Sequence, residues 1–277
     1  MELWTDVHEA LENFYGTRSD LPLIRSEIKH LRFTYRNSWS MGAPSFEGEH
    51  VQAAYSAAYF PSHAYAYLYV LLYRDLGRAI FNNTPTGARV VVLGSGVGAE
   101  TVAVIRWMAE TQNANLTNTS FLLADRADWS NAGANLLNPL LAKHLPKEQV
   151  TIDRALVDLA TIEGQRFITS RIPEADVVLV PSLLTELISE HSADGFLDSL
   201  FKALSPGSKV VLMDHGYSDF ERVSMNWSQQ FQKKISQSNE KVPIPKPSRW
   251  ARLNLLDGQN GRIPVRSYSM SWSVLER

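Results

Sequence analysis

The segment RVVVLGSGVGAET at residues 89–101 gives the clearest indication of the fold of this chain. It joins an apolar run, typical of a buried β-strand, to three alternate glycines and then to an amphipathic segment typical of a helix. The glycines allow positive φ angles and let a ligand approach the backbone, while the first turn of the helix offers unpaired N–H groups. We expect Gly94, Ser95, Gly96 and Gly98 to bind a nucleotide-type cofactor.

The same alternation of strand and helix patterns continues after this stretch. Short apolar runs occur at residues 89–93, 120–124, 150–156, 176–180 and 209–213, and helical patterns occur at 99–112, 130–143, 183–204 and 217–238. Strands that alternate with helices predict a parallel sheet covered on both faces. The expected fold class is therefore α/β, with a doubly wound, Rossmann-like sheet.

The last forty residues have a different pattern. Two strand-like segments, Trp250–Leu256 and Val265–Leu275, flank the turn-forming sequence DGQNG at 257–261. This predicts a terminal antiparallel hairpin, which brings the sheet to seven strands. The proline-rich stretch 241–247 is interpreted as a short linker.

The N-terminal region is predicted to be helical. Helical patterns cover 2–15, 21–36 and 51–81, the last with a break at Pro61. A cluster of turn formers at 82–87 marks the expected border between a helical cap or substrate region, 1–85, and the α/β domain, 86–277.

The composition narrows the classes of function. The chain has 277 residues, 44% of them hydrophobic, and a formal net charge of −2, so it can bury a full core and has no global charge signature of a nucleic-acid-binding protein. Without cysteine there is no disulfide or thiolate site, and a cytoplasmic location is the simplest interpretation. No signal peptide or membrane span is expected. The seven histidines are scattered, so no metal site is expected.

The glycine motif alone does not select one cofactor. Its spacing also fits the relaxed fingerprint of NAD- or FAD-binding proteins. Asp125, at the end of the second apolar run, suits the ribose hydroxyls of either cofactor. Discrimination depends on later segments: LVDL at 156–159, DVVLVPS at 176–182 and LSPGSKVVLMD at 204–214.

Together, these ordered motifs and the terminal hairpin resemble the class I S-adenosylmethionine-dependent methyltransferases. The resemblance implies S-adenosyl-L-methionine as cofactor, held by the glycine turn and by a second group of residues: Asp125, Arg126, Asp158, Leu159 and Pro181. The chain departs from the family at Val92, where an acid usually precedes the first glycine by two residues. Methionyl binding must therefore rely on other groups.

Methyl transfer mainly requires that the nucleophile and the methyl group be held in line. Candidate acid–base groups are His215, after the fifth apolar run, and Glu186, after the fourth. His63, Tyr65 and Tyr217 are candidates for substrate binding. The sequence PSLL at 181–184 differs from the Asn/Asp-Pro-Pro-Tyr/Phe loop of enzymes that methylate exocyclic nitrogens, which disfavours that class of acceptor.

A narrower resemblance is to a methyltransferase-like family associated with the small mitochondrial ribosomal subunit. It depends on DVVLVPSLLTEL at 176–187, VLMDHGYSDF at 211–220 and, more loosely, AYSAAYFP at 54–61. The absence of cysteine removes the iron–sulfur ligands expected of many such proteins, so their ribosomal role does not carry over directly.

Three functions stay open. The leading one is methyl transfer to an unidentified acceptor, which could be a small molecule, a peptide or RNA, although the net charge does not favour RNA. The second is a catalytically silent, methyltransferase-like assembly protein, motivated by Val92. The third is an NAD-dependent oxidoreductase. The sequence does not define the oligomeric state.

Overall fold

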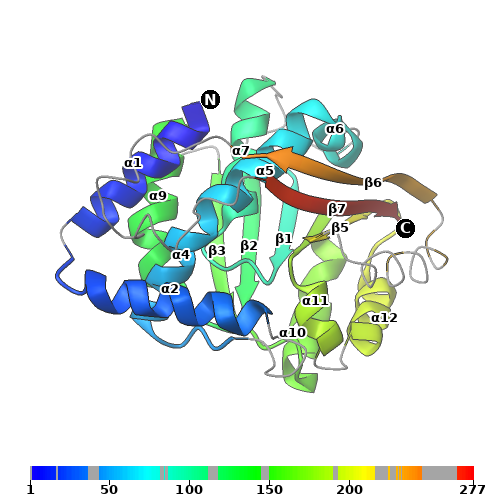
Figure 1. Ribbon diagram of the computed structural model, residues 1–277. Helices are drawn as coiled ribbons and strands as arrows, with labels where there is room; N and C mark the ends of the chain where they lie inside the picture. The colour runs from blue at the N-terminus through cyan, green and yellow to red at the C-terminus, as the bar shows by residue number, and fades with distance from the viewer. Residues whose placement is uncertain are drawn as a thin grey trace.

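The fold is built on one twisted sheet with helices on both faces (Figure 1). The computed structural model describes residues 2–16, 18–36, 44–81, 84, 87–111, 118–144, 150–189, 193–215, 224, 229, 231, 233–244 and 267–277. The strands are β1 (Arg89–Leu93), β2 (Thr119–Asp125), β3 (Val150–Leu156), β4 (Val177–Pro181), β5 (Lys209–His215), β6 (Lys233–Pro243) and β7 (Ser267–Glu276).

The sheet has the order β3-β2-β1-β4-β5-β7-β6. Neighbouring strands from β3 to β5 are parallel, whereas β7 runs antiparallel to both β5 and β6. The predicted α/β class, seven strands and terminal antiparallel pair are thus confirmed. The order reverses between β1 and β4, which is where open α/β sheets bind ligands, at the carboxyl ends of the strands.

Alternating side chains divide the core between the two faces of the sheet. In β1, Val90 and Val92 belong to one buried cluster, while Val91 and Leu93 belong to the other. This is the expected result of the two-residue period of a strand that is buried on both sides. The first cluster includes the N-terminal helices, and the second includes the helices that flank β4.

The helices follow the predicted alternation in part, since α10 and η3 lie between β3 and β4, where no helix was predicted. One face carries α1 (Glu2–Gly16), α4 (Glu49–Ala58), α5 (Phe60–Tyr73), α7 (Ala99–Glu110) and α9 (Asn138–His144), together with α2 (Leu21–Arg36), α6 (Leu76–Phe81), α8 (Ser130–Ala132) and the π-helical turn η2 (Gly133–Leu137) (Figure 1). The other face carries α10 (Ile162–Arg171), the short 3₁₀ helix η3 (Ile172–Glu174), α11 (Leu184–Ser189) and α12 (Ala193–Ala203). The single helix predicted over 183–204 is therefore two helices.

The helices α1, α2, α4, α5 and α6 form an N-terminal cap that packs into the first core cluster, and α4 and α5 reach the glycine turn at the carboxyl edge of the sheet. The predicted break near Pro61 is present, because α4 ends at Ala58 and Pro61 lies in the first turn of α5, where its missing N–H has no cost. Gln52 anchors the cap by donating to the backbone oxygens of Phe46 and Asp128, at 2.9 and 2.8 Å. No helix in the described ranges is long and apolar enough to cross a membrane.

The helix predicted over residues 217–238 is wrong for residues 233–238, which begin β6. β6 is also the partner of β7 in place of Trp250–Leu256, and the proposed linker 241–247 contributes its first three residues to this strand. β6 is an edge strand whose described polar side chains, Lys234, Ser238 and Lys241, are exposed. The sequence of β6 has no local strand pattern, and its ten-residue pairing with β7 determines its conformation. Residues 216–223 and 245–266 lie outside the described chain.

Candidate functional site

The glycine turn between β1 and α7 has the backbone geometry that its sequence predicts. Gly94, Gly96 and Gly98 have φ angles of 70°, 51° and 103°, a region that side-chain-bearing residues rarely adopt. Gly98 is the N-cap of α7. A Cβ on Gly98 would lie 3.2 Å from Leu137, so this glycine is needed for space as well as for conformation.

Two charged side chains from neighbouring strands hold this turn. Asp125, the last residue of β2, accepts hydrogen bonds from the backbone N–H groups of Gly96 (2.8 Å) and Ala127 (3.0 Å). Arg154 of β3 donates to the backbone oxygens of Gly96 (3.1 Å) and Val97 (2.9 Å). The carboxylate has four acceptor positions, so Asp125 still has capacity for the ribose hydroxyls predicted for it.

Arg154 reaches the turn by crossing the glycine of the π-helical turn η2. A Cβ on Gly133 would lie 2.6 Å from the Arg154 guanidinium, closer than atoms can approach. Burial lowers the pKa of Arg154, and the nearby carboxylates of Glu100 and Asp125 oppose that shift. The guanidinium keeps its charge at any physiological pH.

A pocket lies between the glycine turn, the end of β4 and the cap. It is partly open to solvent, and its volume is about 20 Å³. This leaves room for a group about the size of one water molecule, so the pocket suits one end of a ligand. The following residues line it: Tyr55, Phe60, His63, Tyr67, Gly94, Ser95, Val97, Ala99, Glu100, Pro181 and Ser182.

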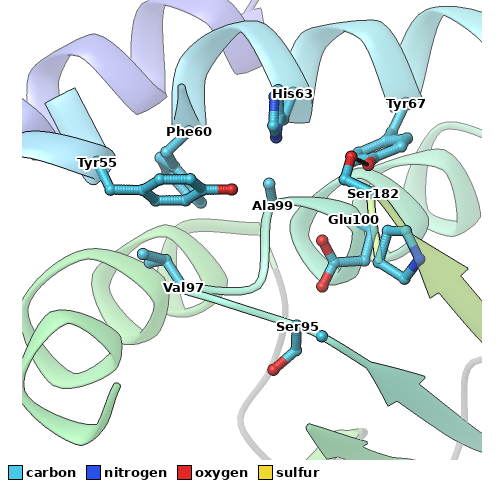
Figure 2. Close-up of a pocket in the computed structure, with 11 residues that line it drawn as sticks. Tyr55, Phe60, His63, Tyr67, Ser95, Val97, Ala99, Glu100 and Ser182 are labelled. Carbon is cyan, nitrogen blue, oxygen red and sulfur yellow. Dashed lines mark hydrogen bonds between the residues drawn. The ribbon is translucent and has the colours of Figure 1, made fainter. Parts of the chain in front are cut away.

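Aromatic side chains of α4 and α5 form the cap side of this pocket (Figure 2). The ring of His63 lies 6.3 Å from that of Tyr55 and 6.1 Å from that of Tyr67, measured between centroids. Tyr67 Oη and Ser182 Oγ are 3.3 Å apart, which joins the cap to the end of β4. Ser182 has a φ of 50°, a strained conformation that is common at functional sites.

The opposite side of the pocket carries a buried carboxyl group. Glu100, the second residue of α7, is 3% exposed, and Ser95 is 4% exposed. Among the described residues, Glu100 Oε1 and Ser95 Oγ have no hydrogen-bond partner. Burial raises the pKa of Glu100 to about 8, against smaller lowering effects of its own backbone N–H and of Arg154.

Two of the predicted cofactor-binding residues, Asp158 and Leu159, follow β3. Asp158 is exposed, and its Oδ1 accepts a hydrogen bond from the backbone N–H of Ala160 at 3.0 Å. Leu159 is buried in the second core cluster. Neither residue lines the pocket described above, so their cofactor role stays a prediction.

Arg126 and Glu186, predicted as cofactor-binding and catalytic residues, lie next to each other. Their closest charged atoms are 3.6 Å apart, and both side chains are partly exposed. Arg126 also donates to the backbone oxygen of Pro44, at 2.9 Å. The pair connects the end of β2 to α11 and to the loop before the cap helix α4, and neither residue lines the pocket.

The remaining candidates occupy separate places. His63 lines the pocket, whereas Tyr65 packs its ring 6.5 Å from that of Tyr69 on another face of α5. The backbone of His215 ends β5, paired with Met270, and its side chain lies outside the described atoms. Tyr217 also lies outside the described residues.

The predicted site residues do not include several that the structure places here, among them Tyr55, Tyr67, Glu100, Arg154 and Ser182. Tyr55 and Tyr67 lie at i−8 and i+4 from His63, so a helical projection from His63 finds them. Glu100 follows the glycine motif directly, but an acid in the first turn of a helix normally faces solvent. Arg154 gives no local signal.

Within the described ranges, no group of three or more histidine, aspartate and glutamate side chains is arranged to hold a metal ion.

No protein-family model matches the sequence, and no curated protein matches it significantly. Solved structures with a similar fold do match. One, from Listeria monocytogenes, is assigned to the class I S-adenosylmethionine-dependent methyltransferases: it is 12% identical, with a TM-score of 0.48, over 100% of this chain and 88% of that one.

Two further solved structures are similar at the same level. The N-methyltransferase NodS from Bradyrhizobium japonicum, in complex with S-adenosyl-L-homocysteine, is 10% identical over 80% of this chain and 90% of its own, with a TM-score of 0.43. An S-adenosylmethionine-dependent O-methyltransferase from Thermotoga maritima is 15% identical over 74% and 65%, with a TM-score of 0.40. These similarities concern the fold and establish no cofactor or reaction. The comparisons do not support the narrower resemblance to the mitochondrial ribosome-associated family.

Proposed function

We propose that this chain transfers a methyl group from S-adenosyl-L-methionine to an acceptor that is not yet identified. One observation carries the proposal: the strand order β3-β2-β1-β4-β5-β7-β6, with β7 antiparallel and the glycine turn at the switch point beside β1. The class I methyltransferase resemblance implies this arrangement. A terminal antiparallel pair is not normal in a dinucleotide dehydrogenase.

The residues at the carboxyl edge of the sheet suit an adenosyl cofactor. The glycine turn leaves room above Gly96, where a Cβ would lie 3.7 Å from the Tyr55 ring. Asp125 has free acceptor positions for a ribose, and the pocket has unused polar atoms on Glu100 and Ser95. The proposed cofactor residues are Gly94, Ser95, Gly96, Gly98, Asp125, Arg126, Asp158, Leu159 and Pro181.

The bound cofactor would supply an activated methyl group on a sulfonium. The chain would then orient the acceptor and exclude water, and the aromatic side chains of the cap that line the pocket suit both tasks. His63, Tyr65 and Tyr217 are proposed for acceptor binding. His215 and Glu186 are the proposed groups for taking a proton from the acceptor.

Calorimetric titration with S-adenosyl-L-homocysteine tests the cofactor assignment. We expect the wild-type protein to bind it, and Asp125→Asn to bind it at least tenfold more weakly because one ribose acceptor loses its charge. NAD, titrated in parallel, should not bind. Binding of NAD without binding of S-adenosyl-L-homocysteine would reject the proposal in favour of a nicotinamide enzyme.

A second candidate is a catalytically silent protein that uses this fold for assembly. The observation that favours it is Val92, which is fully buried in β1 and leaves no carboxylate at the usual position before the turn. In that case neither adenosyl ligand nor NAD would bind at millimolar concentration.

A further inference from the structure

The position of Glu100 is unfavourable for a carboxyl group unless a ligand supplies a hydrogen bond or a charge. The side chain is 97% removed from solvent, and Oε1 has no partner among the described residues. A buried polar atom without a hydrogen bond destabilises the folded state. The carboxyl group is directed into the pocket, towards the space between Ser95 and the rings of Tyr55 and His63 (Figure 2).

The surroundings of Glu100 match one kind of ligand group. Of the described residues that line the pocket, none is a lysine or an arginine, and His63 is the one whose side chain can gain a positive charge by protonation. Ser95 Oγ is a second unused acceptor. The rings of Tyr55, Phe60 and Tyr67 add aromatic faces, which attract cations.

We infer that Glu100, Ser95 and the aromatic side chains of the cap form a subsite for a protonated primary amine. An ammonium group has three N–H donors and one positive charge, and it would satisfy both orphaned oxygen atoms at once. The amine is either the α-ammonium group of the cofactor's amino-acid end or an amino group of the acceptor. The first possibility rests on the proposed function and deepens it.

Glu100 could replace the acid that is missing at Val92. With no acid two residues before Gly94, the methionyl end of the cofactor needs another negative group. Glu100 lies on the other side of the same turn and lines the same pocket as Gly94. The pocket volume of about 20 Å³ also suits an ammonium group at the amino-acid end rather than a whole nucleoside.

Amine binding should also release a proton. Burial raises the pKa of Glu100 to about 8, so the carboxyl group is mostly protonated in the free protein at pH 7. A bound ammonium group favours the carboxylate, and the proton passes from Glu100 to the buffer. The ammonium keeps its own three protons.

Calorimetry with a matched pair of ligands tests the inference. The probes are S-adenosyl-L-homocysteine and its deamino analogue, which lacks the amino group alone. If the amine belongs to the cofactor, the wild type binds the first at least tenfold more tightly, and Glu100→Gln removes this difference. The binding enthalpy of the wild type should depend on the ionisation enthalpy of the buffer, which reports the released proton, and that of Glu100→Gln should not.

The control variant is Glu110→Gln, which makes the same substitution at the other end of α7 on a side chain that is 34% exposed. It should behave like the wild type in both measurements. Ser95→Ala should weaken S-adenosyl-L-homocysteine about threefold, without affecting the deamino analogue. This second variant keeps the test valid if Glu100→Gln does not fold.

A third probe, n-butylammonium, separates the two sources. If the amine belongs to the acceptor, Glu100→Gln leaves both adenosyl ligands unchanged, but it abolishes n-butylammonium binding to the protein saturated with S-adenosyl-L-homocysteine. If neither adenosyl ligand binds the wild type, the proposed cofactor is wrong, and n-butylammonium binding to the protein alone decides the subsite. The inference is overturned if Glu100→Gln changes neither the affinity for any of the amine-containing probes nor the proton release on binding.

Discussion

The side of the glycine turn that contacts β2 and β3 differs from the side that faces the cap. On the first, Asp125 and Arg154 together make three hydrogen bonds to the backbone of Gly96 and Val97. On the second, the buried oxygen atoms Glu100 Oε1 and Ser95 Oγ have no partner among the described residues. The two sides therefore have different roles: the first, the holding side, fixes the backbone of the turn, and the second, the ligand-facing side, is available to a ligand.

The largest expected effect is on stability, when the hydrogen bonds of Arg154 on the holding side are removed. Arg154→Met removes both hydrogen bonds to the turn and the positive charge that acts on Asp125. We expect the free energy of unfolding to fall by about 3 kcal/mol. Urea denaturation measures this change.

Two further variants show whether this effect belongs to the contact itself. Gly133→Ala should displace the Arg154 guanidinium without removing it, and should lower stability in the same direction. Arg166→Met, on an exposed position of α10, should change stability by less than about 0.5 kcal/mol. Equal effects of Arg154→Met and Arg166→Met would contradict the holding role.

Glu100, on the ligand-facing side, should make the free energy of unfolding depend on pH. The folded chain keeps the Glu100 proton up to a pKa of about 8, whereas an unfolded chain loses it near the ordinary pKa of 4.5. The folded state therefore binds more protons between these values, and stability falls as the pH rises through that window. From pH 6 to pH 8 this contribution is about 2 kcal/mol.

Urea denaturation at pH 6, 7 and 8 isolates this contribution. Glu100→Gln cannot titrate, so its stability should fall by less than that of the wild type, while Glu110→Gln should keep the wild-type dependence. Parallel curves for Glu100→Gln and the wild type would show that another group causes the pH dependence.

The turn itself connects the two sides, and Gly98 tests its geometry. Gly98→Ala places a side chain at a φ of 103° and 3.2 Å from Leu137, so we expect a loss of about 2 kcal/mol. Gly207→Ala is the matched comparison, because Gly207 has a φ of 84° but no atom of the described residues within 4 Å of the position that a Cβ would take. It should cost about 1 kcal/mol. A larger loss at Gly207 would mean that crowding by Leu137 is unimportant.

The smallest effect on stability is expected at the Arg126–Glu186 ion pair, which belongs to neither side of the turn. Arg126 and Glu186 form an ion pair at 3.6 Å, with side chains 30% and 23% exposed. Glu186→Gln should therefore lower the free energy of unfolding by less than about 1 kcal/mol. If Glu186 takes a proton from the acceptor, the same variant reduces methyl transfer far more than it reduces stability, and thermal melting beside an activity assay separates these outcomes.

Much of the fold was predictable because its signals are local. The valines of β1, the glycines that follow and the run from Leu204 to Asp214 each encode a backbone conformation within a few residues. β6 was not predictable, since its polar sequence has no strand pattern and its conformation depends on pairing with β7, more than twenty residues later. The break before Pro61 was predictable from the chemistry of proline.

The candidate site divides in the same way. Local sequence patterns were enough to predict the glycine turn, the place of Asp125 at the end of β2 and the carboxyl edge where a ligand would bind. The burial of Glu100 depends on the tertiary structure, because residues of α4 and α5, from a distant part of the chain, line the same pocket. The contact of Arg154 with a turn 58 residues earlier also depends on it. Burial and partners depend on elements that local patterns do not contain, and these two properties turn an ordinary glutamate into a candidate ligand group.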